Sequence, residues 1–209
     1  MVSRLRCFIG GILFCFFTSS FALHATENDD LVKAMMEVYA EELAANPQDY
    51  RTYYSRAMAY FGQGDMKKAL SDIDNAIKYF PRKEKDDLAQ AYLLRAKILS
   101  ERGETKSALT DLNSALRLVP NHRLALKDRG DLLCRLGQYD MAKIDYNHLL
   151  RMDTRSQSAF MGLARVEAHT GQPVRAKDLL AQAVNLSPKD PKIYLERSEI
   201  YKEMDMMPE

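Results

Sequence analysis

The chain has 209 residues, of which 46% are hydrophobic and 28% are charged. This apolar content is too high for a disordered chain and is sufficient for a folded core. Lys and Arg number 30 and Asp and Glu number 29, so there is no charge excess of the kind that marks a nucleic-acid-binding protein. With only 9 Gly and many strong helix formers, the composition disfavours all-β and collagen-like classes.

Residues 1–25 have the three-part pattern of a secretory signal peptide. Arg4 and Arg6 precede an unbroken apolar stretch over residues 7–17, and small residues follow up to Ala25. We therefore predict that the chain is exported, to a periplasm or to the extracellular space, with residues 1–25 removed. The alternative is a membrane anchor formed by residues 7–23, for which the apolar stretch is short.

An amphipathic helix is predicted next, over residues 29–45, and Asn46-Pro47 ends it. We expect residues 26–47 to form a helix that caps the N-terminal end of the domain. The apolar side chains expected to face inward are those of Leu31, Met35, Val38 and Tyr39.

From residue 48 to residue 209 the sequence repeats itself. A Gly-x-x-x-x-Ala pattern recurs at Gly64/Ala69, Gly103/Ala108, Gly137/Ala142 and Gly171/Ala176. Eleven residues before these glycines stand Tyr53, Tyr92, Leu126 and Phe160. Apolar residues at helical spacing predict two helices per repeat, with the glycine ending the first and the alanine at the helix crossing. One such pair cannot bury both of its apolar faces, so the pairs must stack.

This pattern resembles the tetratricopeptide repeat, in which the starting aromatic, the glycine, the crossing alanine and a closing proline such as Pro81 stand at these places. The resemblance covers about residues 50–204 and implies an all-α fold, a right-handed superhelical solenoid of antiparallel helix pairs. Its repeats are expected at about 50–83, 89–122, 123–156 and 157–190, with a partial repeat at 191–209. The departures from the pattern are Leu126, Leu149 and Thr154 in the third repeat and Glu167 in the fourth.

The step from the first repeat to the second is longer than the other steps, which are equal to each other. The excess is five residues and lies around residues 82–87. These residues are expected to form a longer charged loop or an extra turn on the following helix.

Two charged columns run through the repeats and change together. Arginines follow the starting residue by three, and aspartates follow the crossing alanine by three, giving Arg56 with Asp72, Arg95 with Asp111, and Arg129 with Asp145. In the fourth repeat both columns become leucine, at Leu163 and Leu179. Because a buried charge without its partner costs about 3–5 kcal/mol, joint replacement indicates ion pairs between the two helices of a repeat. The alternative is two independent surface columns.

The sequence offers no arrangement for catalysis. It contains no GxxxxGK[ST], HExxH, GxSxG or CxxC motif, and its four histidines lie far apart. Cys134 is the one cysteine that follows the predicted signal peptide, and no set of His, Asp and Asn that would make it a nucleophile accompanies it. We therefore predict a protein that is not an enzyme and has no cofactor or metal.

The resemblance implies a concave groove lined by the first helix of each pair, which would bind a protein or peptide partner. Its expected lining is Arg51, Tyr54, Met58, Phe61, Leu93, Lys97, Lys127, Asp131, Met161, Arg165, Lys192 and Leu195, with Ser100, Cys134, Ala168, Glu199 and Lys202 further along the same faces. Bases outnumber acids there, which favours a ligand with acidic and apolar side chains. The family's clamp for a C-terminal carboxylate is not expected, because Met58, Lys97, Asp131 and Arg165 hold its asparagine places.

The predicted function is therefore an exported scaffold that binds a protein or peptide. Three alternatives remain. The chain could be a subunit whose groove is permanently occupied within an envelope complex, or the recognition module of a longer enzyme, sensor or assembly complex. It could also be a module that binds glycan or cell-wall material. The fifth repeat starts in register at Tyr194 and stops before its second helix. We expect a further helix, a covering partner or self-association at this end.

Overall fold

The computed structural model describes residues 31–204, and within that range all regular structure is helical. The predicted signal peptide and residues 205–209 lie outside the described residues. Within the described range, a helix over residues 31–45 is followed by nine more. These are α2 (Tyr50–Gly62), α3 (Met66–Tyr79), α4 (Lys85–Glu101), α5 (Thr105–Leu118), α6 (Arg123–Arg135), α7 (Tyr139–Met152), α8 (Gln157–His169), α9 (Pro173–Leu186) and α10 (Pro191–Glu203).

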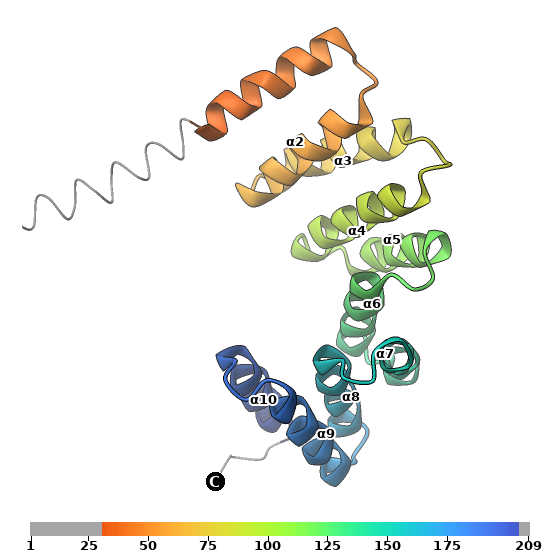
Figure 1. Ribbon diagram of the computed structural model, residues 1–209, viewed down its shortest axis with the longest axis vertical. Coiled ribbons are helices and arrows are strands. Elements are labelled where there is room, and N and C mark those ends of the chain that lie inside the picture. The colour runs from red at the N-terminus through yellow and green to blue at the C-terminus, as the bar shows by residue number, and fades with distance from the viewer. Residues whose placement is uncertain (1–30, 205–209) are drawn as a thin grey trace, which may run out of the picture. The chain divides into compact units, whose positions relative to one another are not determined.

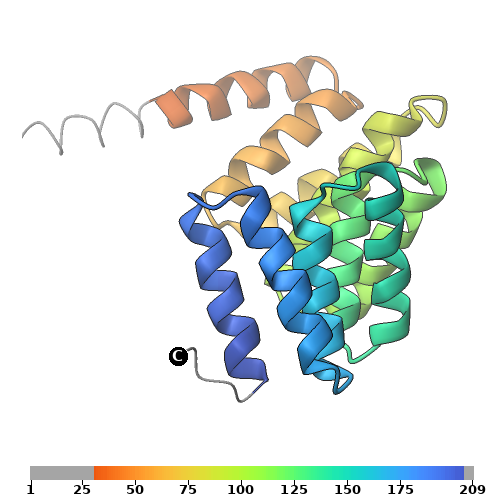
Figure 2. The same cartoon turned by 60° about the horizontal axis from the view of Figure 1, so that its bottom comes forward.

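The chain divides into two compact units, one up to Tyr79 and one from Phe80 onward. The first unit contains the helix over residues 31–45 and the pair α2–α3 (Figure 1). The second unit contains the pairs α4–α5, α6–α7 and α8–α9, together with α10. In this unit α5 contacts α6, α7 contacts α8, and α10 lies against both α8 and α9 (Figure 2). The predicted all-α fold of stacked helix pairs is confirmed.

A glycine with positive φ ends the first helix of every pair. The φ angles are 77° at Gly64, 79° at Gly103, 71° at Gly137 and 74° at Gly171. L-residues rarely adopt this conformation, so the recurrence of glycine has a backbone cause. After the turn, the crossing alanines of the second helices are fully buried, at Ala69, Ala108, Ala142 and Ala176. Their small side chains allow the paired helices to pack closely, as the sequence predicts.

In three pairs, an arginine of the first helix donates two hydrogen bonds to an aspartate of the second. Arg56 Nε and Nη2 lie 2.6 and 2.8 Å from Asp72 Oδ2 and Oδ1. The same two bonds measure 2.7 and 2.7 Å in Arg95–Asp111, and 2.8 and 2.6 Å in Arg129–Asp145. The aspartates are buried, whereas the arginines keep part of their side chains in solvent. Two parallel bonds to one carboxylate also fix the geometry of each pair. Hereafter this arrangement is called the Arg–Asp fork.

The fourth pair replaces this fork by apolar packing. Leu163 of α8 is buried, and Leu179 of α9 packs against the cluster that contains Leu180 and Ile193. A different ion pair joins the third repeat to the fourth. Glu167 of α8 is 3% exposed, and Lys143 Nζ of α7 donates to its Oε1 at 2.7 Å.

The helix over residues 31–45 differs from the prediction. The sequence pattern places Leu31, Met35 and Val38 inward, but all three are exposed, and the buried apolar residue of this helix is Leu43. The last turn is joined to α2 by a hydrogen bond of 2.8 Å from Thr52 Oγ1 to Glu42 Oε2. The amphipathic pattern therefore predicts a helix correctly, but it does not show which side of the helix packs against the rest of the unit.

Four of the five extra residues of the long step extend a helix, since α4 has 17 residues where α2, α6 and α8 each have 13. Of the two predicted outcomes, the structure shows the extra turn, because α4 begins at Lys85 and is longer than the other helices from α2 to α10. Asp86 and Asp87 lie in its first turn, where acidic side chains interact favourably with the helix dipole.

Candidate functional site

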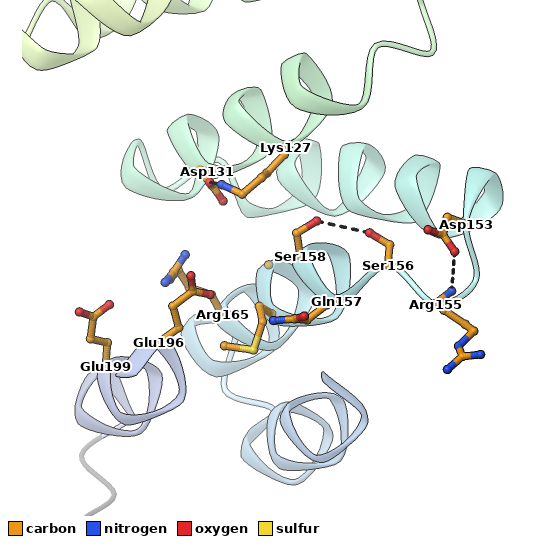
Figure 3. A pocket seen from close by; sticks show the side chains of 12 residues that line it. Lys127, Asp131, Asp153, Arg155, Ser156, Gln157, Ser158, Arg165, Glu196 and Glu199 are labelled. Carbon is orange, nitrogen blue, oxygen red and sulfur yellow. Dashed lines mark hydrogen bonds and ion pairs between the residues drawn. The ribbon is translucent and has the colours of Figure 1, made fainter. Parts of the chain in front are cut away.

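The second unit contains an open cavity of about 570 Å³, here called the α6–α10 cavity. Helices α6, α8 and α10 and the connection between α7 and α8 form its walls (Figure 3). It is lined by Lys127, Asp131, Asp153, Arg155, Ser156, Gln157, Ser158, Met161, Gly162, Arg165, Glu196 and Glu199. This volume lies within the range of ligand-binding pockets, about 300–1,000 Å³.

A buried tyrosine lies behind this cavity and fixes one of its acidic groups. Tyr146 of α7 is 0% exposed, and its hydroxyl donates to Asp131 Oδ1 at 2.6 Å. Lys127 Nζ donates to Asp131 Oδ2, also at 2.6 Å. Both carboxylate oxygens of Asp131 are thus engaged, so this residue is a fixed part of the wall.

Two glycines make room for the ring of Tyr146. A Cβ atom at Gly162 of α8 would lie 2.2 Å from Tyr146 Cε1, and one at Gly130 of α6 would lie 2.8 Å from the same atom. Ile73, Leu112 and Leu180 hold the place of Tyr146 in the other pairs. The third repeat therefore has a tyrosine where the others have an aliphatic side chain, with glycines on both neighbouring helices.

Burial and charge shift the pKa values around this tyrosine. Burial, reinforced by the charge of Asp131, raises the pKa of Tyr146, so its hydroxyl remains a hydrogen-bond donor at neutral pH. Burial lowers the pKa of Lys127, but attraction to Asp131 and the hydrogen bond between them outweigh it, and the net pKa is raised. Burial also raises the pKa of Asp128, whose Oδ2 has no hydrogen-bond partner and lies 4.0 Å from Lys97 Nζ.

The charged groups of the cavity are unevenly paired. Besides Lys127 with Asp131, Arg165 Nε lies 3.6 Å from Glu203 Oε2, and Asp153 Oδ2 lies 3.3 Å from Arg123 Nη1. Among the residues described, no ion pair within 4 Å joins the carboxylates of Glu196 and Glu199 or the guanidinium of Arg155, although the charge of Glu196 helps to raise the pKa of Lys127. Figure 3 shows the two glutamates on α10 at one end of the cavity and Arg155 at the other. The cavity therefore presents unpaired negative charge at its α10 end.

The structure brings four of the predicted groove residues together at this cavity. These are Lys127, Asp131, Met161 and Arg165, from α6 and α8, and they are joined by Glu199 of α10, which was expected further along the same groove. The α2 set belongs to the first unit, where its members follow one another along a single face of the helix. That set is Arg51, Tyr54, Met58 and Phe61.

Four predicted groove residues do not line the cavity. Leu93 is 3% exposed and belongs to the core, so it offers almost no surface to a ligand. Lys97 is exposed on α4, beside Asp128. Lys192 and Leu195 are exposed on α10, but the face of that helix turned to the cavity carries Glu196 and Glu199. The lining has three bases and four acids, so the expected basic groove is not what the cavity presents.

Sequence reasoning missed most of the connection between α7 and α8. Asp153, Arg155 and Ser156 lie outside the periodic pattern, which gave no signal for them. Gly162 carried a signal, because a glycine inside a helix marks a close approach.

Two further observations, on metal ligands and on membrane spans, concern the described part of the chain. Within residues 31–204, no group of three or more His, Cys, Asp or Glu side chains is arranged to hold a metal ion. Each helix described is too short or too polar to cross a membrane.

Comparison with solved structures identifies the fold. A tetratricopeptide repeat protein from Parabacteroides merdae has 27% sequence identity and a TM-score of 0.74, over 86% of this chain and 69% of that one. YrrB, described as a tetratricopeptide repeat protein with an unusual peptide-binding site, has 19% identity and a TM-score of 0.68, over 83% and 86%. MamA from Desulfovibrio magneticus has 18% identity and a TM-score of 0.62, over 75% and 85%.

No protein of curated function matches the chain in sequence. The sequence profile of the tetratricopeptide repeat, however, matches residues 36–86, 54–123 and 127–191. Proteins of this family are typically scaffolds for protein–protein interaction without catalytic activity. With matches over most of the chain and the fold of the solved repeat proteins, this protein belongs to the tetratricopeptide repeat family.

Proposed function

We propose that this protein is an exported scaffold that binds a peptide segment of a partner protein in the α6–α10 cavity. The observation that carries the proposal is the pair of unpaired carboxylates, Glu196 and Glu199, on the wall of a cavity of ligand size. The fold supports the general role, since the solved repeat protein YrrB is described as having a peptide-binding site.

The charges around the cavity suggest the chemistry of the ligand. A lysine or arginine side chain of a bound peptide would lie against Glu196 and Glu199, where it would form charge-assisted hydrogen bonds. Ser158 and Gln157 offer polar groups to a peptide backbone, and Arg155 offers a cation to an acidic residue at the other end. We therefore expect a ligand that is basic at its α10 end, in place of the acidic peptide expected from the sequence.

Selection from a random peptide library against the purified chain tests this function. Enrichment of lysine or arginine at one peptide position is expected. The selected peptides should bind the double variant Glu196→Gln/Glu199→Gln about three- to tenfold more weakly, as for partly exposed ion pairs. Asp178→Asn, an exposed carboxylate on α9 outside the cavity lining, is the matched control and should change nothing. Unchanged affinity in the double variant would place the binding site elsewhere.

Export is part of the same proposal and rests on the sequence of residues 1–25. Mass spectrometry of the protein produced in a bacterial host should find an N-terminus near Leu23 or Thr26, after the small residues that precede them. Recovery of intact Met1 in the soluble cytoplasmic fraction would contradict export and would leave the peptide-binding proposal unaffected.

A further inference from the structure

A small cavity adjoins the α6–α10 cavity, and the proposed function leaves it unused. Its volume is about 100 Å³, and it lies at the start of α6, beside the end of α7 and the start of α8. It is called the Leu124 pocket here, and it is lined by Arg123, Leu124 and Leu149, together with Lys127, Asp153, Ser156 and Ser158. The last four residues also line the α6–α10 cavity, so the two cavities are neighbours with a shared wall.

Leu124 is an exposed leucine at a place where the other repeats have polar side chains. The residues two places before the starting residue of the other repeats are Arg51, Gln90, Ser158 and Lys192. In the third repeat this residue is Leu124, which is 50% exposed. Because the other repeats have a polar residue here, the repeat fold does not itself require a leucine at this place.

Leu149 departs from the repeat pattern at the same pocket. Ala76, Ala115 and Ala183 hold its place in the other second helices, and all three are fully buried. Leu149 has a longer side chain, is 3% exposed and lines the Leu124 pocket. The third repeat therefore places two leucines in one cavity, at positions where the other repeats have none.

Ser156 and Ser158 connect the Leu124 pocket with the α6–α10 cavity. Both serines line both cavities, and their hydroxyl oxygens lie 3.3 Å apart (Figure 3). A peptide bound against these serines would therefore have the pocket within reach of a neighbouring side chain.

The charged groups at the Leu124 pocket are paired. Arg123 Nη1 donates to Asp153 Oδ2 at 3.3 Å, and Lys127 Nζ donates to Asp131 Oδ2 at 2.6 Å. The pocket therefore presents little free charge, in contrast to the α10 end of the α6–α10 cavity. The methylene groups of Arg123 and Lys127 add to the apolar surface of the two leucines. This environment suits an uncharged, apolar group.

We infer that the Leu124 pocket is a second specificity site for the same peptide and binds one aliphatic side chain of it. This inference rests on the proposed function, because the peptide must lie in the α6–α10 cavity to reach the pocket. The size of the pocket limits the side chain. A closed apolar cavity of about 150 Å³ holds a benzene ring, so about 100 Å³ favours leucine, isoleucine or valine over an aromatic residue. The complete ligand is then a peptide with a basic residue at the α10 end and an aliphatic residue in the pocket.

The peptide library that tests the proposed function also provides the ligands for this test. Peptides selected on the unaltered chain should have an aliphatic residue at a fixed distance from the basic one. Changing that residue to alanine should weaken binding about tenfold, since each methylene group removed from apolar contact is worth about fourfold in affinity. Fluorescence anisotropy of labelled peptides measures these affinities.

Leu124→Ser is the first protein variant, and its fold should be intact because Ser158 holds this place in the fourth repeat. It should bind the aliphatic peptide about three- to tenfold more weakly but the alanine peptide nearly as well as the unaltered chain does. Leu195→Ser makes the same change at a leucine of α10 that is 66% exposed and lines neither cavity. This matched control should bind both peptides normally.

Leu149→Ala, the second protein variant, should change the preference of the pocket. Alanine is the residue of the other second helices at this place, and its smaller side chain enlarges the pocket. A peptide with phenylalanine in place of the aliphatic residue should bind this variant about fivefold more tightly than it binds the unaltered chain, whereas the aliphatic peptide should bind it more weakly. A general loss of structure would weaken the binding of both peptides.

The outcomes separate this inference from the proposed function. Selected peptides with a basic residue but no preferred aliphatic position would overturn the inference and leave the proposed function intact. An unchanged affinity ratio of the aliphatic and alanine peptides in Leu124→Ser would also overturn it. An aliphatic preference that depends on Leu124, with full affinity in Glu196→Gln/Glu199→Gln, would support the pocket and contradict the proposed role of the two glutamates. A library without any enriched peptide would overturn both.

Discussion

Replacing Gly162 with alanine is expected to destabilise the second unit, although alanine is the better helix former. The new Cβ would lie 2.2, 2.3 and 2.6 Å from three atoms of the Tyr146 ring, all shorter than real contacts allow. The ring cannot withdraw, because the backbone of Gly130 lies close to it as well and Asp131 holds its hydroxyl at 2.6 Å. Overpacking of this kind costs about 1–3 kcal/mol. We take the upper part of that range and subtract about 1 kcal/mol for helix propensity, which leaves a net loss of about 1–2 kcal/mol.

The same substitution should change sign when the ring is removed. In a Tyr146→Leu background, Gly162→Ala should raise the free energy of unfolding by up to about 1 kcal/mol, the gain in helix propensity alone. Leucine is a suitable replacement, because Leu112 and Leu180 hold this place in neighbouring pairs. Urea unfolding followed by circular dichroism measures all four proteins, and Gly62→Ala, with no atom within 4 Å of its new Cβ, controls for helix propensity. A loss of equal size in both backgrounds would refute the steric reasoning.

The Arg–Asp fork of the second repeat should behave as one unit. Arg95→Leu should cost about 3 kcal/mol because it strands the buried Asp111, Asp111→Leu should cost less because Arg95 reaches solvent, and the double variant should recover part of the loss in urea unfolding. If the losses of the two single variants simply add in the double variant, Arg95 and Asp111 do not interact. Asp128→Asn should stabilise the protein at neutral pH by up to about 1 kcal/mol. Burial raises the pKa of the Asp128 carboxyl in the folded state. Below its ordinary pKa of 3.8 the carboxyl is protonated in both states and does not destabilise the fold, whereas its ionisation lowers the stability as the pH rises through the raised pKa. The advantage of the variant should therefore vanish below pH 3.8, and a gain that persists there would have another cause. Burial also raises the pKa of the Cys134 thiol, so iodoacetamide should modify it more slowly in the folded than in the urea-unfolded chain at neutral pH, as peptide mass spectrometry can measure. Equal rates would mean that the thiol is accessible and ionised.

The repeat architecture could be predicted from the sequence because its determinants are local. Gly64 and its equivalents mark the turns through a backbone requirement, and Ala69 and its equivalents mark the crossings through a volume requirement. The joint change of the arginine and aspartate columns to Leu163 and Leu179 indicated that the side chains of these two columns are in contact. This inference works within a single chain, because the repeats supply several versions of one contact.

The candidate site could be predicted only in part, because it depends on how helices rotate against one another. Lys127 and Arg165, which were chosen for their position on the first helix of a repeat, both line the α6–α10 cavity. On α10 the prediction included Glu199, which lines the cavity, but it chose Leu195 and missed the neighbouring Glu196. A rotation by one residue changes the side chain presented, and the sequence periodicity does not fix such a rotation. The helix over residues 31–45 shows the same limit, since its apolar stripe with Leu31 is exposed.

The ion pair between Lys143 and Glu167 gives the repeats a fixed order. In an array of self-contained units, one period could be removed or duplicated with little effect on its neighbours. Removal of residues 123–156 from this chain would instead bring Leu109 of α5 to the place where Lys143 now lies. Glu167 would then keep only the exposed Arg175, whose Nη2 lies 3.8 Å from its Oε1, and the loss of its main cation would cost up to about 3 kcal/mol. The fourth repeat therefore requires the third one before it, and an engineered or naturally shortened version would have to replace Glu167 by an apolar residue at the same time.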